Sequence, residues 1–336
     1  MARNCVALIR VIRVQNDLCI RRAPENGLTT CPCHTGPGTP IVGGPSDTLR
    51  SHAAVSHGVR EIPMIKFIAS DIDGTLVLPD LTITPRVRAA IQAAQARGVV
   101  VTLATGRGAV PTDQFADSLG LTAPLVCMQG AQIFDHRARK VLHEIFLPDG
   151  VKEWAIALAA EQGWDLHFES REYVYHSNQI DSVDEVKEIY RLSNRRGVDS
   201  FMEDMPEHPH KFLVALREPA QAEGVMQTLR AAVKDAGFGL EIVASSPYLI
   251  EGLAQGVNKS VGLTWLVGEL GIDPADVLAI GDNDNDVEML TWAGTGVAMG
   301  NASPRARAVA DWIAPSVQED GVAVAIEKFV LGQSAS

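Results

Sequence analysis

The chain has 336 residues, a length that fits one large α/β unit or a core with one insertion. Its composition, with 46% hydrophobic and 21% charged residues, is typical of globular proteins and excludes a disordered, collagenous or coiled-coil chain. The formal net charge of −12 argues against a nucleic acid or an anionic membrane as the main partner, because both would be repelled.

Residues 1–63 differ in kind from the rest of the chain. They carry a charge of +3, whereas the remaining 273 residues carry −15. They show no sustained hydrophobic period after about Ile20, which predicts a poorly ordered extension. Because a convincing first strand begins at Met64, upstream sequence read from a mis-set start is an alternative explanation. Arg10 and Arg13 interrupt the apolar run that a signal peptide would need, so we expect no secretion signal.

The cysteines favour a reducing compartment. The sequence Cys31-Pro32-Cys33-His34 places three soft metal ligands together, but no second pair stands at zinc-finger spacing, and we interpret it as chance composition. Cys127 is alone in the globular part, which fits a cytoplasm without structural disulfides. No segment approaches the roughly 18 apolar residues of a membrane helix, so we expect a soluble cytoplasmic protein.

From Met64 onward, short apolar runs alternate with amphipathic helices. This alternation predicts an α/β fold with a doubly wound parallel sheet. Thr84 is the expected N-cap of the first helix, with Pro85 at its first position and Gly98 after its end. The strands predicted in this first part lie at 65–70, 99–104 and 125–128.

The pattern changes between 148 and 252. This segment is far longer than a connection within the sheet requires, so we predict an α+β domain inserted between two core segments, 64–147 and 253–332. Its predicted helices lie at 151–162, 183–193 and 220–236, and its predicted strands at 164–168, 173–176, 211–216, 240–243 and 248–253.

The last part returns to the α/β alternation. We predict a helix at 257–270, a strand at 277–280, a helix at 287–292 and a strand at 296–299. Ser303 and Pro304 then begin a short helix.

Polar residues stand where the predicted core strands end. Asp71 and Asp73 follow the first strand, Thr105 follows the second, and Asp282 follows a strand far downstream. Ligands of open α/β sheets bind outside the carboxyl ends of the strands, so these residues are expected to converge although they are far apart in the chain. Asp and Gly are also common in turns, so the Asp-x-Asp-Gly sequence alone proves little.

The loop 281–286 is densely acidic. Asp282, Asp284 and Asp286 would repel one another without a cation, which predicts a hard metal with oxygen ligands. Their spacing matches the start of a calcium EF-hand loop, but Val287 replaces the required Gly and Ala293 stands where the bidentate Glu should be. The alternative to a metal site is that these Asp and Asn residues only cap the helix that follows.

Two further features suit phosphate. Thr105 offers a hydroxyl and Gly106 an unhindered amide at a strand end, and Lys259 stands near a helix start. Each feature also has an ordinary explanation, because Thr-Gly is a common turn and a lone lysine is usually solvated.

Together these residues resemble the four motifs of the haloacid dehalogenase superfamily of phosphohydrolases, in particular its Cof-type branch. The order, spacing and strand context of the motifs agree from residue 64 to about 330. The resemblance implies a Rossmann-like core, and it implies that the insertion is the large cap of that branch. The motifs are Asp71-Ile72-Asp73-Gly74-Thr75-Leu76, Ala104-Thr105-Gly106-Arg107, Gly256-Val257-Asn258-Lys259, and Gly281-Asp282 with Asn285-Asp286 and Met289.

The resemblance also implies a mechanism, in which Asp71 attacks phosphorus to form an aspartyl-phosphate and Asp73 serves as general acid and then base. It implies Mg²⁺ as the cofactor. The implied metal ligands are the Asp71 carboxylate, the Asp73 carbonyl and Asp282, with Asp286 beside the metal. The implied phosphate-binding residues are Thr105, Gly106, Lys259 and Asn285.

The leading hypothesis is a magnesium-dependent phosphatase of small phosphorylated metabolites, such as sugar phosphates or phosphorylated cofactors, working as a monomer or small homo-oligomer. A phosphomutase would use the same aspartyl-phosphate. A phospho-accepting signalling domain is a rival of another class, but it needs neither a general acid such as Asp73 nor a large cap. The candidate substrate-reading residues of the cap, of which we expect about two to touch the ligand, are Arg171, Tyr173, Tyr175, His176, His208, His210 and Lys211.

Overall fold

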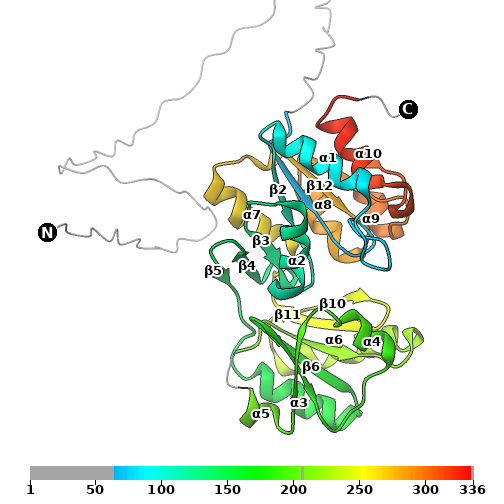
Figure 1. The fold of residues 1–336 in the computed structure, drawn as a ribbon. Helices are drawn as coiled ribbons and strands as arrows, with labels where there is room; N and C mark the ends of the chain where they lie inside the picture. Colours follow the sequence, from blue (N-terminus) through cyan, green and yellow to red (C-terminus); the bar gives the residue numbers. More distant parts are fainter. Residues whose placement is uncertain (1–63, 206–207, 334–336) are drawn as a thin grey trace, which may run out of the picture. The chain divides into compact units, whose positions relative to one another are not determined.

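The computed structural model describes residues 64–205 and 208–333, and it contains the predicted parallel sheet (Figure 1). The sheet has five strands in the order β14-β13-β12-β1-β2, and every neighbouring pair is parallel. Its strands are β1 (Phe67–Ser70), β2 (Val100–Leu103), β12 (Val277–Gly281), β13 (Thr295–Ala298) and β14 (Trp312–Ile313). The predictions for residues 1–63 lie outside the described residues.

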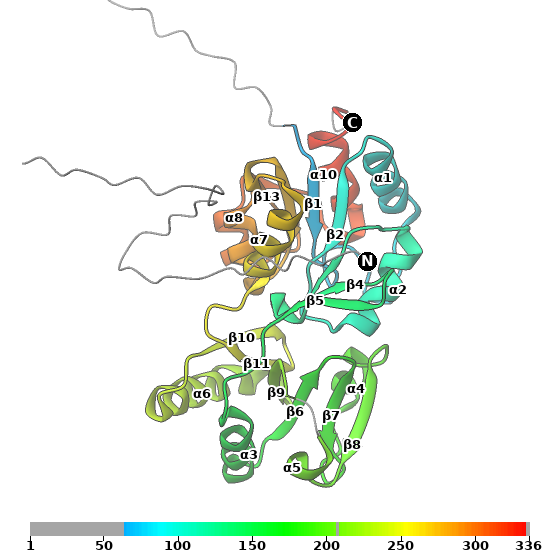
Figure 2. The ribbon, with the colours of Figure 1, turned by 90° about the vertical axis from the view of Figure 1, so that its left-hand side faces the viewer.

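Helices cover both faces of this sheet. The central strands β1 and β12 are buried along their whole length, as expected when helices pack on both sides. Helix α1 packs against α10, and α8 packs against α7 and α9, on opposite sides of the strands (Figure 2). The core helices are α1 (Pro85–Ala96), α2 (Ala109–Leu119), α7 (Lys259–Leu270), α8 (Val287–Trp292), α9 (Pro304–Val309) and α10 (Gly321–Phe329).

The third predicted parallel strand belongs to a different sheet. Strand β3 (Leu125–Cys127) forms an antiparallel sheet with β4 (Gln132–Asp135) and β5 (Lys140–Glu144). It joins the parallel sheet at a bridge between Ala104 and Val126. The turn η1 (Met128–Gly130) reverses the chain after β3, so this strand pairs with β4 rather than continuing the parallel order.

A separate six-stranded sheet occupies the segment predicted as the insertion, and its strand β11 runs two residues past the predicted boundary at 252. Its order is β10-β11-β9-β6-β7-β8, and all neighbours are antiparallel except β7 and β8. Helices α3 and α6 pack on it around a hydrophobic core of its own. The strands are β6 (Asp165–Ser170), β7 (Tyr173–Ser177), β8 (Asn194–Val198), β9 (Lys211–Ala215), β10 (Leu240–Ser246) and β11 (Leu249–Ala254), and the helices are α3 (Val151–Gln162), α4 (Asp184–Ile189), α5 (Phe201–Asp204) and α6 (Ala222–Ala236).

The observed helix starts agree with the predicted ones more closely than some of the observed helix ends do. The Thr84 hydroxyl accepts a hydrogen bond from the Val87 amide, and that of Ser303 from the Ala306 amide, which confirms both predicted caps. The predicted helix at 183–193 was four residues too long at its end, because α4 ends at Ile189 and a turn leads to β8 at Asn194. Short 3₁₀ turns complete the fold at η2 (Pro219–Gln221), η3 (Pro274–Asp276), η4 (Asp284–Asp286) and η5 (Val317–Glu319).

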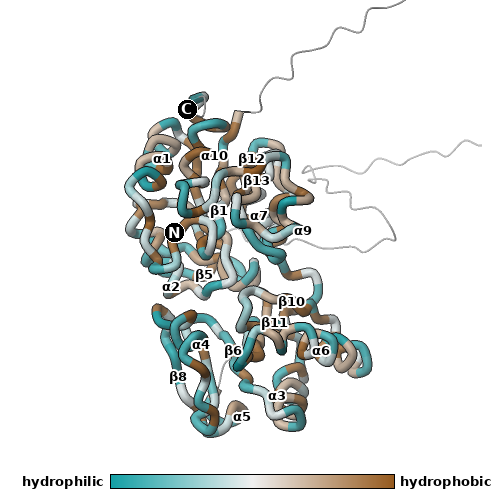
Figure 3. Tube along the Cα trace, turned by 90° about the vertical axis from the view of Figure 1, so that its right-hand side faces the viewer, coloured by the Kyte–Doolittle hydropathy of each residue, from teal (hydrophilic) through white to brown (hydrophobic). Residues whose placement is uncertain are grey.

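Hydrophobic residues gather around β12, β13 and α10, whereas outer turns are hydrophilic (Figure 3). Among the described residues, every helix is too short or too polar to cross a bilayer.

Candidate active site

The predicted convergence at the strand ends is present. Strand β1 pairs with both β2 and β12, so the loops after these three strands leave the sheet side by side. The Asp71 amide donates to the carbonyl of Ile280, which fixes the end of β1 against β12. One cavity of about 180 Å³ collects the predicted residues Asp71, Asp73, Thr105, Gly106 and Asn285.

Asp71, Asp282 and Asp286 form an acidic cluster in which one carboxylate oxygen of each lies within 4.8 Å of the others. Asp286 is fully buried, and its Oδ2 accepts hydrogen bonds from the amides of Asp282 (2.8 Å) and Asn283 (2.9 Å). Asp284 lies apart from this cluster, because its carboxylate pairs with Arg305. The EF-hand alternative therefore fails in the structure as well, since Asp284, the second of the three acids in the loop, pairs with Arg305 instead.

Lys259 is the buried counter-charge of the cluster. Its Nζ donates to Oδ1 of Asp71 and to Oδ1 of Asp286, each at 2.6 Å. Burial opposes its charge, but Asp286 and Asp71 outweigh that effect and raise the pKa of Lys259. The side chain of Asn258 caps α7 and accepts from the amides of Ser260 and Val261, so the helix begins at Lys259 rather than at 257. Lys259 is thus held inside the site and is not a solvated surface residue.

The carboxylates outnumber the positive charge that faces them. Burial and the neighbouring Asp286 raise the pKa of Asp282 to about 7. Burial also raises the pKa of Asp71 well above its ordinary value, and Asp286 and Asp282 add to that rise although Lys259 opposes it. A second cation with a preference for oxygen ligands would relieve this repulsion, so the donor set fits Mg²⁺.

The loop after β1 turns tightly beside Asp282. Gly74 has a φ of +77°, and a Cβ atom there would lie 2.4 Å from Oδ2 of Asp282. The Thr75 hydroxyl donates to the other oxygen of Asp282 at 2.8 Å. The Asp-x-Asp-Gly-Thr sequence therefore positions Asp282 as well as presenting its own two acids.

Arg107 holds the second acid of that loop. Its Nε and Nη2 donate to the two oxygens of Asp73, each at 2.7 Å, in a bidentate pair. Arg107 belongs to the second motif in the sequence, but no role was predicted for it. The only sequence signal was its position directly after Thr105-Gly106.

Thr105, Gly106 and Asn285 meet around Gln129. The Thr105 hydroxyl accepts from the Arg107 amide at 3.1 Å, and the Nδ2 of Asn285 donates to Oε1 of Gln129 at 3.1 Å. A Cβ at Gly106 would lie 2.6 Å from Nε2 of Gln129. Gln129 carried no motif, so sequence reasoning missed it.

The insertion contributes the facing wall of the cavity. Nζ of Lys211 donates to the carbonyl of Gly106 at 2.7 Å and pairs with Glu169 at 3.1 Å and Glu251 at 3.2 Å. Glu169 lies opposite Lys211 in the ladder of β6 and β9, which brings their side chains together. The two glutamates were missed in the sequence, where they stand far apart in ordinary strand patterns.

Of the seven cap residues proposed as substrate readers, Lys211 lines this cavity and the other six do not. Arg171 pairs instead with Glu144 at 3.0 Å, and the ring of His210 packs on Phe146. Tyr175 is buried in the hydrophobic core of the insertion. The expectation that about two of these residues touch the ligand stays a prediction.

Comparisons with known proteins agree with this geometry. A family-wide sequence profile described as haloacid dehalogenase-like hydrolase matches residues 68–326. The chain is 33% identical over 273 residues to the 5-amino-6-(5-phospho-D-ribitylamino)uracil phosphatase YcsE of Bacillus subtilis, covering 81% of this chain and 98% of that one. A solved haloacid dehalogenase-like hydrolase from Bacteroides thetaiotaomicron superposes with a TM-score of 0.70 at 27% identity, covering 79% of this chain and 99% of that one. A solved sugar phosphatase of subclass IIB of the same superfamily gives a TM-score of 0.68 at 25% identity, with coverages of 79% and 98%.

Proposed function

The chain belongs to the haloacid dehalogenase-like hydrolases, enzymes that act on phosphate esters, and we propose that it is a magnesium-dependent phosphatase. Its proposed substrates are small phosphorylated metabolites, and its proposed intermediate is an aspartyl-phosphate. One observation carries the proposal. The Asp71 carboxylate lies after the end of β1 beside a buried lysine and two further acids, and it lines a cavity to which the insertion contributes one wall.

The residues of the acidic cluster would hold the metal. Asp71 and Asp282 have a carboxylate oxygen to offer, and the backbone carbonyl of Asp73 is the third proposed ligand. Both oxygens of Asp286 already accept hydrogen bonds, which favours a position beside the ion rather than directly on it. Bound Mg²⁺ would supply positive charge where a carboxylate meets a phosphate, two anions that repel by about 4 kcal/mol at 4 Å and an effective dielectric near 20.

The chain's own residues would then perform two displacements. In the first, a carboxylate oxygen of Asp71 bonds to phosphorus as the bond to the leaving oxygen breaks, and Asp73 donates its proton to that oxygen. In the second, Asp73 takes a proton from water, the water oxygen bonds to phosphorus, and the bond to Asp71 breaks. Lys259, the Thr105 hydroxyl, the Gly106 amide and Asn285 would hold the phosphoryl oxygens during both steps.

The wall from the insertion suits a hydroxyl-rich leaving group. Glu169 and Glu251 line the cavity and can accept hydrogen bonds from hydroxyl groups, while Lys211 holds the two carboxylates in place. Relatives named as phosphatases of a ribityl compound and of sugars support this substrate class. The cytoplasmic location and the oligomeric state stay predictions.

The proposal is tested by phosphate release from a panel of sugar and polyol phosphates with and without Mg²⁺. We expect Asp71→Asn to lower kcat by roughly a thousandfold or more, because no nucleophile replaces the carboxylate. We expect Asp73→Asn to lower it by about 10²- to 10⁴-fold. The matched control is Asp235→Asn, which neutralises an exposed acid on α6. Undiminished turnover in Asp71→Asn would overturn the mechanism, and phosphate transferred back to a sugar rather than released would indicate a phosphomutase.

A further inference from the structure

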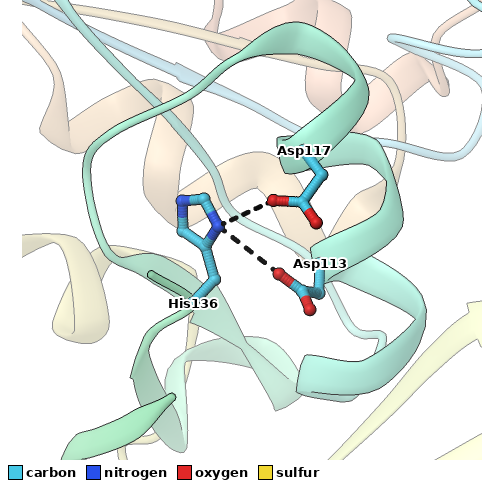
Figure 4. A group of neighbouring side chains, drawn as sticks. All are labelled: Asp113, Asp117 and His136. Atoms are coloured by element: carbon cyan, nitrogen blue, oxygen red, sulfur yellow. Dashed lines mark ion pairs between the residues drawn. The ribbon is translucent and has the colours of Figure 1, made fainter. Parts of the chain in front are cut away.

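A second cluster of metal-ligating side chains lies on α2 and the turn after β4, formed by residues other than those of the acidic cluster at Asp71. Asp113 and Asp117 stand one helical turn apart on the same face of α2, and His136 follows the end of β4 (Figure 4). In Figure 4 the two carboxylates and the imidazole point toward one another. The helix and the hairpin therefore present three ligands to one point.

The distances within this cluster suit a metal better than direct hydrogen bonds. Nδ1 of His136 lies 3.4 Å from Oδ1 of Asp113 and 3.5 Å from Oδ1 of Asp117. Hydrogen bonds from nitrogen to oxygen normally span about 2.7–3.2 Å. Bonds of about 2.0–2.2 Å from Zn²⁺ to nitrogen and oxygen place neighbouring ligands of a tetrahedral site roughly 3.4 Å apart. The observed separations match the edge of such a site.

Two of the three ligands, His136 and Asp113, have buried atoms without a hydrogen-bond partner in the part of the chain that the structure describes. The His136 side chain is 2% exposed, and neither of its ring nitrogens has a hydrogen-bond partner among residues 64–205 and 208–333. Oδ1 of Asp113 is likewise buried without a partner in that part of the chain. Groups of this kind cost free energy unless something satisfies them.

Neighbouring residues hold the ligands in place. Arg139 pairs with Oδ2 of Asp113, which leaves Oδ1 aimed at His136. The Arg139 guanidinium also lies over the Phe134 ring, 5.3 Å from its centroid. The Asp117 side chain is 74% exposed and gives an ion a path from solvent.

We propose that Asp113, Asp117 and His136 bind a divalent transition metal, with Zn²⁺ as the best-fitting ion. One imidazole nitrogen and two carboxylate oxygens are a ligand set that Zn²⁺ accepts, and water would complete the coordination on the open side of Asp117. The ion would also relieve the repulsion between two like charges one turn apart on α2. Helix α2 follows directly after the loop of Thr105, Gly106 and Arg107. The ion would therefore link α2 to the β4–β5 hairpin and restrain the loop before it.

The test compares metal binding by the full-length protein and its variants in excess Mg²⁺, which under the proposed function occupies the acidic cluster at Asp71. Zn²⁺ per chain is measured after dialysis, and Co²⁺ is followed by its visible absorption. We expect His136→Gln and Asp117→Asn to bind about one Zn²⁺ fewer than the wild type, or to bind it at least tenfold more weakly. We also expect both variants to lose the Co²⁺ band and the rise in Tm on adding Zn²⁺.

The controls separate this site from other metal-binding groups. Asp235→Asn removes an exposed helical acid elsewhere and should bind Zn²⁺ like the wild type. The cysteines at 5, 19, 31 and 33 are the same in every variant, so their contribution cancels in the difference. Should His136→Gln fail to fold, Asp117→Asn decides alone, because Asp117 is exposed. Equal Zn²⁺ binding by wild type and Asp117→Asn would overturn the proposal.

Discussion

At the scale of single residues, the tightest constraint in the proposed active site is a glycine. Gly74 adopts a left-handed conformation directly beside Asp282, and the space for a side chain is already filled by that carboxylate. Replacing Gly74 by any other residue would therefore have two effects: it would strain the backbone, and it would displace Asp282, a proposed metal ligand.

Gly74→Ala tests both costs. We expect the unfolding free energy to fall by about 1–2 kcal/mol from the left-handed backbone. We also expect phosphatase activity and Mg²⁺ affinity to drop at least tenfold, because the Cβ would lie 2.4 Å from Oδ2 of Asp282. Gly98→Ala is the matched control, since Gly98 has a φ of +82° with nothing within 4 Å of its Cβ position. Equal loss of activity in both variants would show that strain alone is responsible.

At the scale of elements, local signals predicted those parts of the fold that local chemistry determines. The caps at Thr84 and Ser303 were correct, because each depends on a side chain and an amide three residues apart. Strand β8 has the sequence Asn-Arg-Arg-Gly-Val, which lacks an alternating apolar pattern, and it forms because β7 offers a free edge. The β4–β5 hairpin was missed for a related reason: its first strand, β4, pairs with β3, which we had assigned to the parallel sheet.

The residues of the candidate site also fall into those that local signals predict and those that they do not. Asp71, Thr105 and Asp282 could be predicted because parallel strands bring their carboxyl ends together. The position of Gln129 could not be predicted, because this residue lies in a turn and has a left-handed backbone conformation with a φ of +57°. The place of Glu169 in the site could not be predicted either. It depends on how the insertion packs against the core, and no spacing between residues in the sequence indicates that.

Lys211 on strand β9 links three elements, and Lys211→Met tests that link. The substitution leaves Glu169 and Glu251 buried together without a counter-charge, so we expect the unfolding free energy at pH 8 to fall by about 3–5 kcal/mol. Burial raises the pKa of Glu169 and the Lys211 charge opposes that rise, so in the variant this carboxyl can neutralise at a higher pH. The stability difference measured by urea unfolding should therefore be smaller at pH 5 than at pH 8.

The matched comparison replaces all three members of the group. Lys211→Met combined with Glu169→Gln and Glu251→Gln removes the buried charges together, and we expect it to recover much of the lost stability. If the single and triple variants unfold at the same urea concentration, the ion pairs do not carry the effect, and the contact of Lys211 with the Gly106 carbonyl becomes the remaining explanation.

At the scale of the whole molecule, the net charge of −12 includes buried acids whose charge destabilises the metal-free protein. Burial and Asp286 hold the pKa of Asp282 at about 7, above its value of about 3.9 in an unfolded chain. The folded state therefore binds this proton more tightly than the unfolded state does. It follows that this group lowers the stability of the metal-free protein as the pH rises from about 4 to about 7.

Magnesium should reverse this dependence, because it binds the ionised carboxylate that a proton would otherwise neutralise. With a pKa of about 7, roughly one tenth of Asp282 is ionised at pH 6 and nearly all at pH 8, so we expect the apparent Mg²⁺ affinity to rise about tenfold between them. Thermal unfolding with and without Mg²⁺ should then show a larger increase in Tm at pH 8 than at pH 6, with ionic strength matched by NaCl to exclude screening. In Asp282→Asn the increase in Tm should become small at both pH values. An equal increase in Tm at both pH values in the wild type would show that Asp282 does not ionise on binding the metal, and would place the ion elsewhere among the acids.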